Sequence, residues 1–112
     1  MKIIFSDKKP RDECAIFGVS GNSQAAQLVA LGLHALQHRG QDSTGVVTTD
    51  NTNFFAHRGM GQVSEVFSDK KVFSHLKGEL SICHNRYGTT GESALKNVQP
   101  LFSELNIGGI AI

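Results

Sequence analysis

The chain has 112 residues, 39% of them hydrophobic, and its 11 Lys and Arg residues nearly balance its 10 Asp and Glu residues. This length holds one domain at most, and the composition is typical of a soluble globular protein rather than a disordered or membrane protein. The charges are scattered along the sequence, so we expect neither nucleic acid nor a membrane surface as a partner. The longest apolar run, residues 28–36, is interrupted by Gly32 and His34 and is much shorter than the roughly 20 residues of a membrane span.

The cysteines and histidines point away from disulfides and metals. Two cysteines without a signal peptide favour reduced thiols and a cytoplasmic location. Neither Cys14 nor Cys83 has a CxxC or zinc-like spacing, and the five histidines are dispersed, so we expect no metal site.

Residues 1–13 predict a removable leader. They are too polar to form a core and too weakly apolar to act as a signal peptide. Cleavage between Glu13 and Cys14 would leave one residue with both a thiol and a free α-amine, groups whose unperturbed pKa values are about 8.5 and about 7.7–8.0. Such a residue supplies its own base, which makes Cys14 the candidate nucleophile. The alternative is a buried structural thiol at the start of a strand.

The first elements follow directly. The apolar run 15–19 predicts a buried strand that ends in a turn at residues 20–22. A helix is predicted from an N-cap at residue 22 or 23 to about residue 38, with Gly40 as its stop. Its apolar residues recur at steps of three and four and form one stripe: Ala25, Ala26, Val29, Leu33 and Leu36.

The middle of the sequence predicts a hairpin followed by short helices. β-branched residues predict a strand over residues 43–49, and a turn at 50–52 leads into a second strand over 53–58. The segment 59–61 is expected to break the hairpin, and the mixed region 63–76 predicts short helical pieces.

The last third predicts three strands and a long loop. A strand is expected over residues 79–84, followed by a loop over 85–100 of a length that usually carries function. Residues 101–112 predict two more strands, on either side of Asn106 and Gly108-Gly109. The sequence stops inside the second of these, which we expect to leave apolar surface and strand edges unpaired.

Two segments carry side chains suited to a binding site. Arg39 and Gly40 lie at the junction between the first helix and the next strand, where glycine allows close approach; the alternative is a helix C-cap with Arg39 on the negative end of the dipole. Arg86 lies just past a strand end at the mouth of the long loop, and a guanidinium can hold a carboxylate by two parallel hydrogen bonds. The alternative for Arg86 is a solvated loop arginine. His84 is interpreted as a hydrogen-bonded structural histidine and Cys83 as a structural thiol.

Taken together, four motifs closely resemble the N-terminal glutaminase domain of the amidophosphoribosyltransferases, which catalyse the first committed step of purine synthesis. The motifs are Cys14 before Ile-Phe-Gly, then residues 36–45, then 84–91, and then Asn97-Val98-Gln99-Pro100. The resemblance covers essentially all of residues 14–112. Related N-terminal-nucleophile (Ntn) amidotransferases such as glucosamine-6-phosphate synthase have Tyr-Arg-Gly-Tyr-Asp at residues 38–42, where this chain has His-Arg-Gly-Gln-Asp.

The resemblance implies an α+β fold, the α/β/β/α sandwich of the Ntn hydrolases, of which this chain would hold about the first half. It divides the chain into a leader, residues 1–13, and a partial type 2 glutamine amidotransferase domain, residues 14–112. Cys14 would attack the side-chain amide of glutamine and its α-amine would relay the proton. Ammonia would leave as a thioester forms, and water would then release glutamate from the thioester.

Other residues take their roles from the same resemblance. Arg86 would clamp the α-carboxylate of glutamine and Thr89 would line the same pocket, while Arg39 and Gly40 would support the nucleophile. Complete members pass the ammonia to a second domain that binds phosphoribosyl pyrophosphate with magnesium, some carry an iron–sulfur cluster, and they form homo-oligomers. No cofactor is expected within these 112 residues.

The sequence also departs from the family. Ala15 and Cys83 each stand where glycine is common, and the family's Ala-His-Asn-Gly-Asn segment, which forms the oxyanion hole, is not among the 112 residues. We therefore expect that these 112 residues alone do not hydrolyse glutamine at an enzyme-like rate. Turnover that depends on Cys14 would mean that they supply their own oxyanion site, for instance from backbone N–H groups around Gly108-Gly109. Two hypotheses therefore stand, the front part of a glutamine amidotransferase and a catalytically inactive remnant or interaction module of the same family. A binding module unrelated to glutamine is a third.

Overall fold

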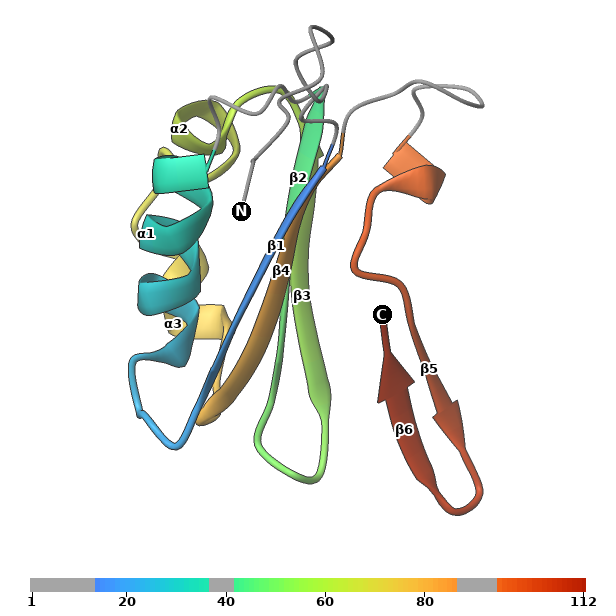
Figure 1. Cartoon of the computed structure of the whole chain (residues 1–112). Helices are drawn as coiled ribbons and strands as arrows, with labels where there is room; N and C mark the ends of the chain where they lie inside the picture. Colours follow the sequence, from blue (N-terminus) through green and yellow to red (C-terminus); the bar gives the residue numbers. More distant parts are fainter. Residues whose placement is uncertain (1–13, 37–41, 87–94) are drawn as a thin grey trace, which may run out of the picture.

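A computed structural model of the chain describes residues 14–36, 42–86 and 95–112. A four-stranded antiparallel sheet of order β1-β4-β2-β3 has helices on one face and a separate two-stranded hairpin on the other (Figure 1). The strands are β1 (Ala15–Ser20), β2 (Ser43–Thr49), β3 (Phe54–Met60), β4 (Leu80–Arg86), β5 (Phe102–Leu105) and β6 (Gly108–Ala111). The helices within the described residues are α1 (Ala25–Leu36), α2 (Val63–Val66), α3 (Val72–His75) and the short 3₁₀ helix η2 (Leu95–Asn97). None of the helices in these ranges is long and apolar enough to cross a membrane.

The helix α1 forms where the apolar spacing predicts it. The Asn22 side-chain oxygen accepts a hydrogen bond of 2.8 Å from the backbone N–H of Gln24, which caps the N-terminus. The apolar stripe is buried against β1 and β4, and its members Val29 and Leu33 are completely covered. The expected stop at Gly40 lies outside the described residues.

The core lies between α1 and the sheet. It joins α1 to β2 and β4 and extends to the short helices α2 and α3, which cover the same face. Its buried members are Ala26, Val29, Leu33, Val46, Val63, Leu76 and Cys83. Gly32 of α1 has a packing role there, because a Cβ at this position would overlap the ring of Phe17 on β1.

The prediction that the first strand is buried is wrong. β1 has the predicted position, but only Ala15 is buried along it, and Ile16 is 75% exposed. β1 is an edge strand, and α1 covers only the face that carries Ala15 and Phe17. The apolar composition of β1 therefore leaves an uncovered surface on the opposite face of the sheet.

The hairpin β2–β3 is longer than predicted. β2 matches the expected range, but β3 continues through Gly59 and Met60, which pair with Thr44 and Ser43. The expected break at residues 59–61 comes only at Gly61, which has a φ of 109°, because Gly59 and Met60 still find ladder partners. Gly59 is needed for packing instead, since a Cβ there would lie 3.0 Å from the side chain of Val66 on α2.

The prediction for β4 was also too short. The strand includes Asn85 and Arg86, so Arg86 is its last residue rather than part of the following loop. The short helical pieces and the β5–β6 hairpin are confirmed, with Gly108 and Gly109 inside β6 rather than in the turn.

Candidate functional site

Three side chains of interest lie at one end of the main sheet. β1 and β4 pair so that Ala15 lies opposite Asn85, and β2 and β4 pair so that Ser43 lies opposite Arg86. Continuing the β1–β4 register by one residue places Cys14 opposite Arg86. Cys14, Arg86 and Ser43 therefore form one row across three neighbouring strands.

The alternation of side chains assigns Arg86 to the face of the sheet opposite the helices, which we call the open face. Asn85 faces α1, because its amide nitrogen donates to the carbonyl of Leu33 at 3.1 Å and its oxygen accepts from the Thr44 hydroxyl at 2.7 Å. Neighbours along a strand point to opposite faces, so Arg86 and His84 project away from the helices. These two buried hydrogen bonds of Asn85 fix the register, since a slip of one residue would leave the amide without partners.

The backbone around Arg86 is held firmly. Its carbonyl accepts a 2.8 Å bond from the N–H of Asp42, whose own carbonyl accepts a 2.9 Å bond from the N–H of Gly61. The Ser43 hydroxyl donates to the Asp42 carboxylate at 3.2 Å. The end of the sheet is thus tied together from β4 across β2 to β3.

The two thiols have opposite environments. Cys14 is exposed, and Cys83 is buried in the core. The Cys83 thiol donates to the carbonyl of Phe17 at 3.1 Å, and burial raises its pKa to about 12. Cys83 is therefore a structural thiol, as the sequence interpretation has it, and Cys14 is the accessible one.

His84 differs from its interpretation as a hydrogen-bonded structural histidine. Its ring is half-buried, and its Nδ1 atom is buried without a hydrogen-bond partner. Burial and the neighbouring Arg86 charge lower the pKa of His84, so the imidazole is neutral at neutral pH. The sequence shows the motif around His84, but the lack of a hydrogen-bond partner for Nδ1 depends on the packing of the folded chain.

The segment after η2 crosses the open face at Gly45. A Cβ on Gly45 would overlap the carbonyl oxygen of Gln99, so this glycine allows the crossing. Arg58, opposite Gly45 on β3, donates to the carbonyl of Val98 at 3.0 Å and places its guanidinium 6.0 Å from the Phe102 ring centroid. The Asn97-Val98-Gln99-Pro100 motif thus forms the segment that crosses the sheet at Gly45 and is held there by Arg58.

A cavity of about 770 Å³ opens between this segment and the neighbouring strands β1 and β4. Its walls come from β1, β4, the Gln99-Pro100 pair and Ile112, and they are mainly apolar. His84 contributes the titratable imidazole among them. The cavity starts one row from Cys14 and Arg86 and runs along the open face.

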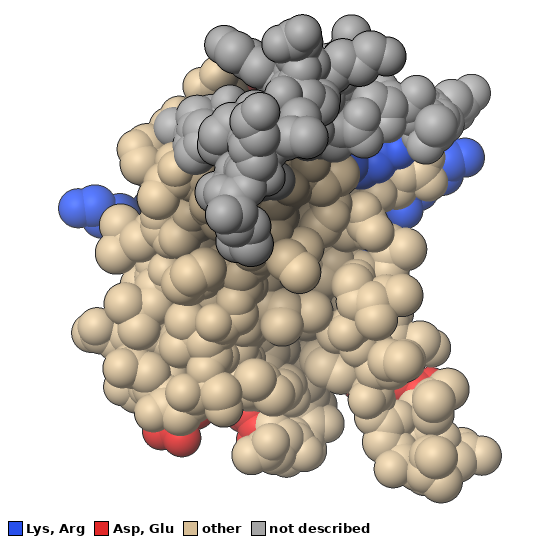
Figure 2. Space-filling view, viewed as in Figure 1, with Lys and Arg blue, Asp and Glu red and all other residues tan. Residues whose placement is uncertain are grey.

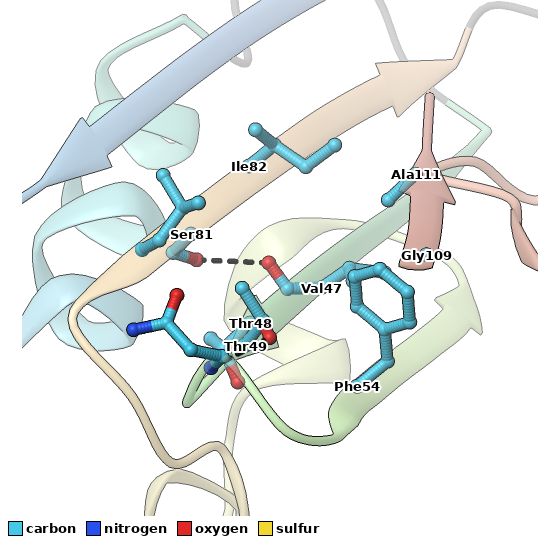
Figure 3. Close-up of a pocket in the computed structure, with 10 residues that line it drawn as sticks. Val47, Thr48, Thr49, Phe54, Ser81, Ile82, Gly109 and Ala111 are labelled. Carbon is cyan, nitrogen blue, oxygen red and sulfur yellow. Dashed lines mark hydrogen bonds between the residues drawn. The ribbon is translucent and has the colours of Figure 1, made fainter. Parts of the chain in front are cut away.

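A second cavity, of about 340 Å³, lies at the opposite end of the sheet (Figure 3). Ser81 donates there to the Val47 carbonyl at 3.2 Å, and Phe54 and Gly109 close one side. Its lining holds hydroxyl, amide and apolar groups but no thiol, imidazole or charged side chain. It therefore lacks the chemistry of a nucleophilic site.

Gly108 and Gly109 lie far from Cys14. Gly109 packs against Phe54, which pairs with Thr49 at the far end of the sheet from Ser43. Thr49 lies six residue steps along β2 from Ser43, a distance of about 20 Å. The Gly109 N–H is too remote to stabilise charge beside Cys14.

Arg39, Gly40, Thr89 and the leader residues 1–13 lie outside the described residues, so their predicted roles stay predictions. Within the described ranges, no three His, Cys, Asp or Glu side chains come together as a metal site.

Comparison with known proteins identifies relatives of this chain. The chain is 52% identical over 101 residues to the amidophosphoribosyltransferase of Rhizobium etli, a match that covers 90% of this chain and 20% of that protein. This match confirms the prediction from the motifs. The relatives of this chain are amidophosphoribosyltransferases. No protein-family model matches the chain.

Solved structures agree with these relatives. One, described as the allosteric regulatory enzyme of purine biosynthesis, superposes with a TM-score of 0.77 at 43% identity and covers 86% of this chain and 21% of that one. The glutamine phosphoribosylpyrophosphate amidotransferase of B. subtilis, solved with ADP and GMP, gives 0.74 at 41% identity and covers 86% and 20%. The chain thus spans about a fifth of the length of the amidophosphoribosyltransferases it matches. The α+β Ntn-hydrolase fold is confirmed, here as one sheet with its helical layer and one hairpin.

Proposed function

We propose that this chain forms the glutamine-binding part of a glutamine amidotransferase of purine biosynthesis. Cys14 hydrolyses the side-chain amide of glutamine, and the ammonia serves to make phosphoribosylamine from phosphoribosyl pyrophosphate, which binds outside these residues. One observation carries the proposal: Ala15 pairs with Asn85, so the register continued by one residue sets the exposed Cys14 opposite Arg86 at the same end of the sheet. This arrangement offers a nucleophile and a carboxylate receptor to one amino-acid ligand.

The chemistry follows from these two groups. The Cys14 sulfur forms a bond to the side-chain carbonyl carbon of glutamine, the amide nitrogen takes a proton, and the carbon–nitrogen bond breaks to release ammonia. Water then attacks the thioester and yields glutamate and the free thiol. Removal of residues 1–13 would give Cys14 an α-amine that moves the proton, since an acylated nitrogen cannot act as the base.

Arg86 binds rather than reacts. A guanidinium presents a planar pair of N–H donors that matches a carboxylate, and the backbone bond from Asp42 to the Arg86 carbonyl fixes the start of the side chain. Thr89, Arg39 and Gly40 complete the pocket in this proposal. The function requires a reducing compartment such as the cytoplasm, because a thiol oxidised to a disulfide is no nucleophile.

The test is affinity labelling of Cys14 by the chloromethyl ketone analogue of glutamine, measured by mass spectrometry. The Cys14 thiolate displaces chloride and forms a stable thioether. We expect saturable labelling at Cys14 that is at least about 10-fold faster than labelling by chloroacetone, and we expect glutamine to slow it. A Cys14→Ala variant is the control for labelling elsewhere.

The inactive remnant is the alternative. It predicts that the glutamine analogue and chloroacetone label Cys14 at similar rates and that glutamine gives no protection. That outcome would refute the proposed function.

A further inference from the structure

His84 occupies the row next to that of Arg86 on the open face. Across this row Ile16 lies on one side of His84 and Gly45 on the other, and Arg58 follows beyond Gly45. Because the Gln99 carbonyl takes the space above Gly45, the imidazole lies between an apolar edge strand and a backbone segment. The proposed mechanism leaves this polar ring in the cavity wall unused.

The packing determines which ring nitrogen carries the proton. The Nδ1 atom is buried without a partner, so a proton there would leave a buried donor unsatisfied, and buried N–H groups without partners are rare. Double protonation would have the same defect and would add a cation beside Arg86. The neutral ring protonated on Nε2 avoids both. Since the ring is half-buried and Nδ1 is covered, the Nε2–H group lies on its accessible edge.

We propose that His84 is a second receptor for the α-carboxylate of glutamine, donating a hydrogen bond from Nε2–H to the carboxylate that Arg86 clamps. The inference rests on the proposed function and adds a binding residue to it. His84 and Arg86 are two residues apart on one strand, so their side chains project from the same face about 6.6 Å apart at the backbone. A carboxylate between them accepts from both side chains, because each oxygen has two acceptor positions.

A neutral donor suits this position. A second fixed cation next to Arg86 would repel both the guanidinium and the α-ammonium group of the amino acid. A neutral N–H group adds directional recognition of the carboxylate without that charge. Hydrogen bonds to a charged group are the stronger kind, so the loss of this one should be easy to measure.

The test uses the labelling of Cys14 in three variants of His84. Glutamine places its amide nitrogen where histidine has Nε2, whereas asparagine places it where histidine has Nδ1. We therefore expect His84→Gln to keep the specificity constant for the glutamine chloromethyl ketone within about 3-fold, and His84→Asn and His84→Ala to lower it by about 10-fold or more. The exposed His75 on α3 gives the matched control, His75→Gln, which should have no effect.

Two further measurements separate the possible outcomes. Alkylation by iodoacetamide, which carries no carboxylate, should be equal in all variants, and circular dichroism should show equal folding. An analogue whose α-carboxylate is replaced by a carboxamide should react equally with wild type and His84→Ala. If the glutamine analogue is selective for Cys14 but all His84 variants keep that selectivity, the role of His84 is refuted and the proposed function stands. If wild type shows no selectivity, the proposed function itself fails.

Discussion

At the residue scale, the two cysteines show how position in the sheet determines thiol reactivity. Cys14 precedes the first residue of an edge strand, and Cys83 is the middle residue of a central strand and faces α1. Burial raises the pKa of Cys83 to about 12, because a thiolate in the core would lose its hydration.

We expect one reactive thiol per folded chain. At pH 8 a disulfide reagent such as dithionitrobenzoate should react rapidly with Cys14 only, because the thiolate is the nucleophile and Cys83 remains a buried thiol. Two thiols should react in denaturant. Rapid reaction of the folded Cys14→Ala variant would show that Cys83 is accessible after all.

Arg86 should be sensitive to a substitution that keeps its charge. Arg86→Lys replaces a planar pair of donors by a single ammonium, so the labelling of Cys14 by the glutamine analogue should slow by about 10-fold or more. Labelling by chloroacetone should be unchanged. Equal slowing by both reagents would assign Arg86 a structural role only.

His84 should make stability depend on pH in the acid range. Its pKa in the folded chain lies below the ordinary value of 6.5, mainly because of burial and in part because of Arg86, with Arg58 as the next charge along the row. The unfolded chain therefore binds a proton more readily, and the free energy of unfolding should fall as pH decreases below about 6.5. Urea titrations between pH 7.5 and 5 would measure this decrease.

The variant His84→Gln supplies the comparison. It cannot titrate, so its stability should fall less over the same pH range than that of wild type. Parallel curves for the two proteins would show that other groups cause the acid sensitivity.

At the element scale, Gly45 determines how the C-terminal segment lies on the sheet. A Cβ there meets the backbone of Gln99, which cannot rotate away as a side chain can. Gly45→Ala should therefore displace the crossing and lower stability by about 1–3 kcal/mol, the usual effect of overpacking.

The matched control for Gly45 is Gly18→Ala on β1, where a Cβ would lie 3.5 Å from its nearest neighbour. We expect its stability to remain within about 0.5 kcal/mol of wild type in urea unfolding. Equal losses in both variants would contradict the close crossing at Gly45.

At the scale of the whole molecule, much apolar surface remains in contact with water. On the face shown in Figure 2 charged side chains lie mainly at the periphery and uncharged ones cover the middle. Large hydrophobic side chains are exposed on β1 and on the β5–β6 hairpin, including Ile16 at 75% and Ile107 at 96%. Both strands of the hairpin are also edge strands. Such surfaces favour association with other chains.

We expect the isolated 112-residue chain to associate with increasing concentration. Ile107→Lys should weaken this association by replacing the exposed apolar side chain in the hairpin turn with a charge, as measured by sedimentation velocity. His75→Lys adds the same charge without removing apolar surface and should have a smaller effect. A chain that stays monomeric at all concentrations would contradict this expectation.

Local patterns were sufficient for most elements. The apolar spacing of α1 and the β-branched run of β2 determine both elements, because helix and strand periods are properties of neighbouring residues. The motifs around Cys14 and Arg86 also identified the relatives, since order and spacing along the chain are sequence properties. The ends of β3 and β4 were wrong because a strand continues as long as a neighbouring strand offers hydrogen bonds.

The tertiary structure alone decided the environments. The exposure of Ile16 depends on which face α1 covers, and the missing partner of His84 Nδ1 depends on how β1, β2 and Gln99 surround one ring. The row that places Cys14 opposite Arg86 arises because residues about 70 positions apart pair across two strands, and register is fixed by the buried Asn85 and the core side chains. The sequence by itself determined which groups are present and in what order; which of them face one another, and in what state of protonation, was decided by long-range pairing and burial.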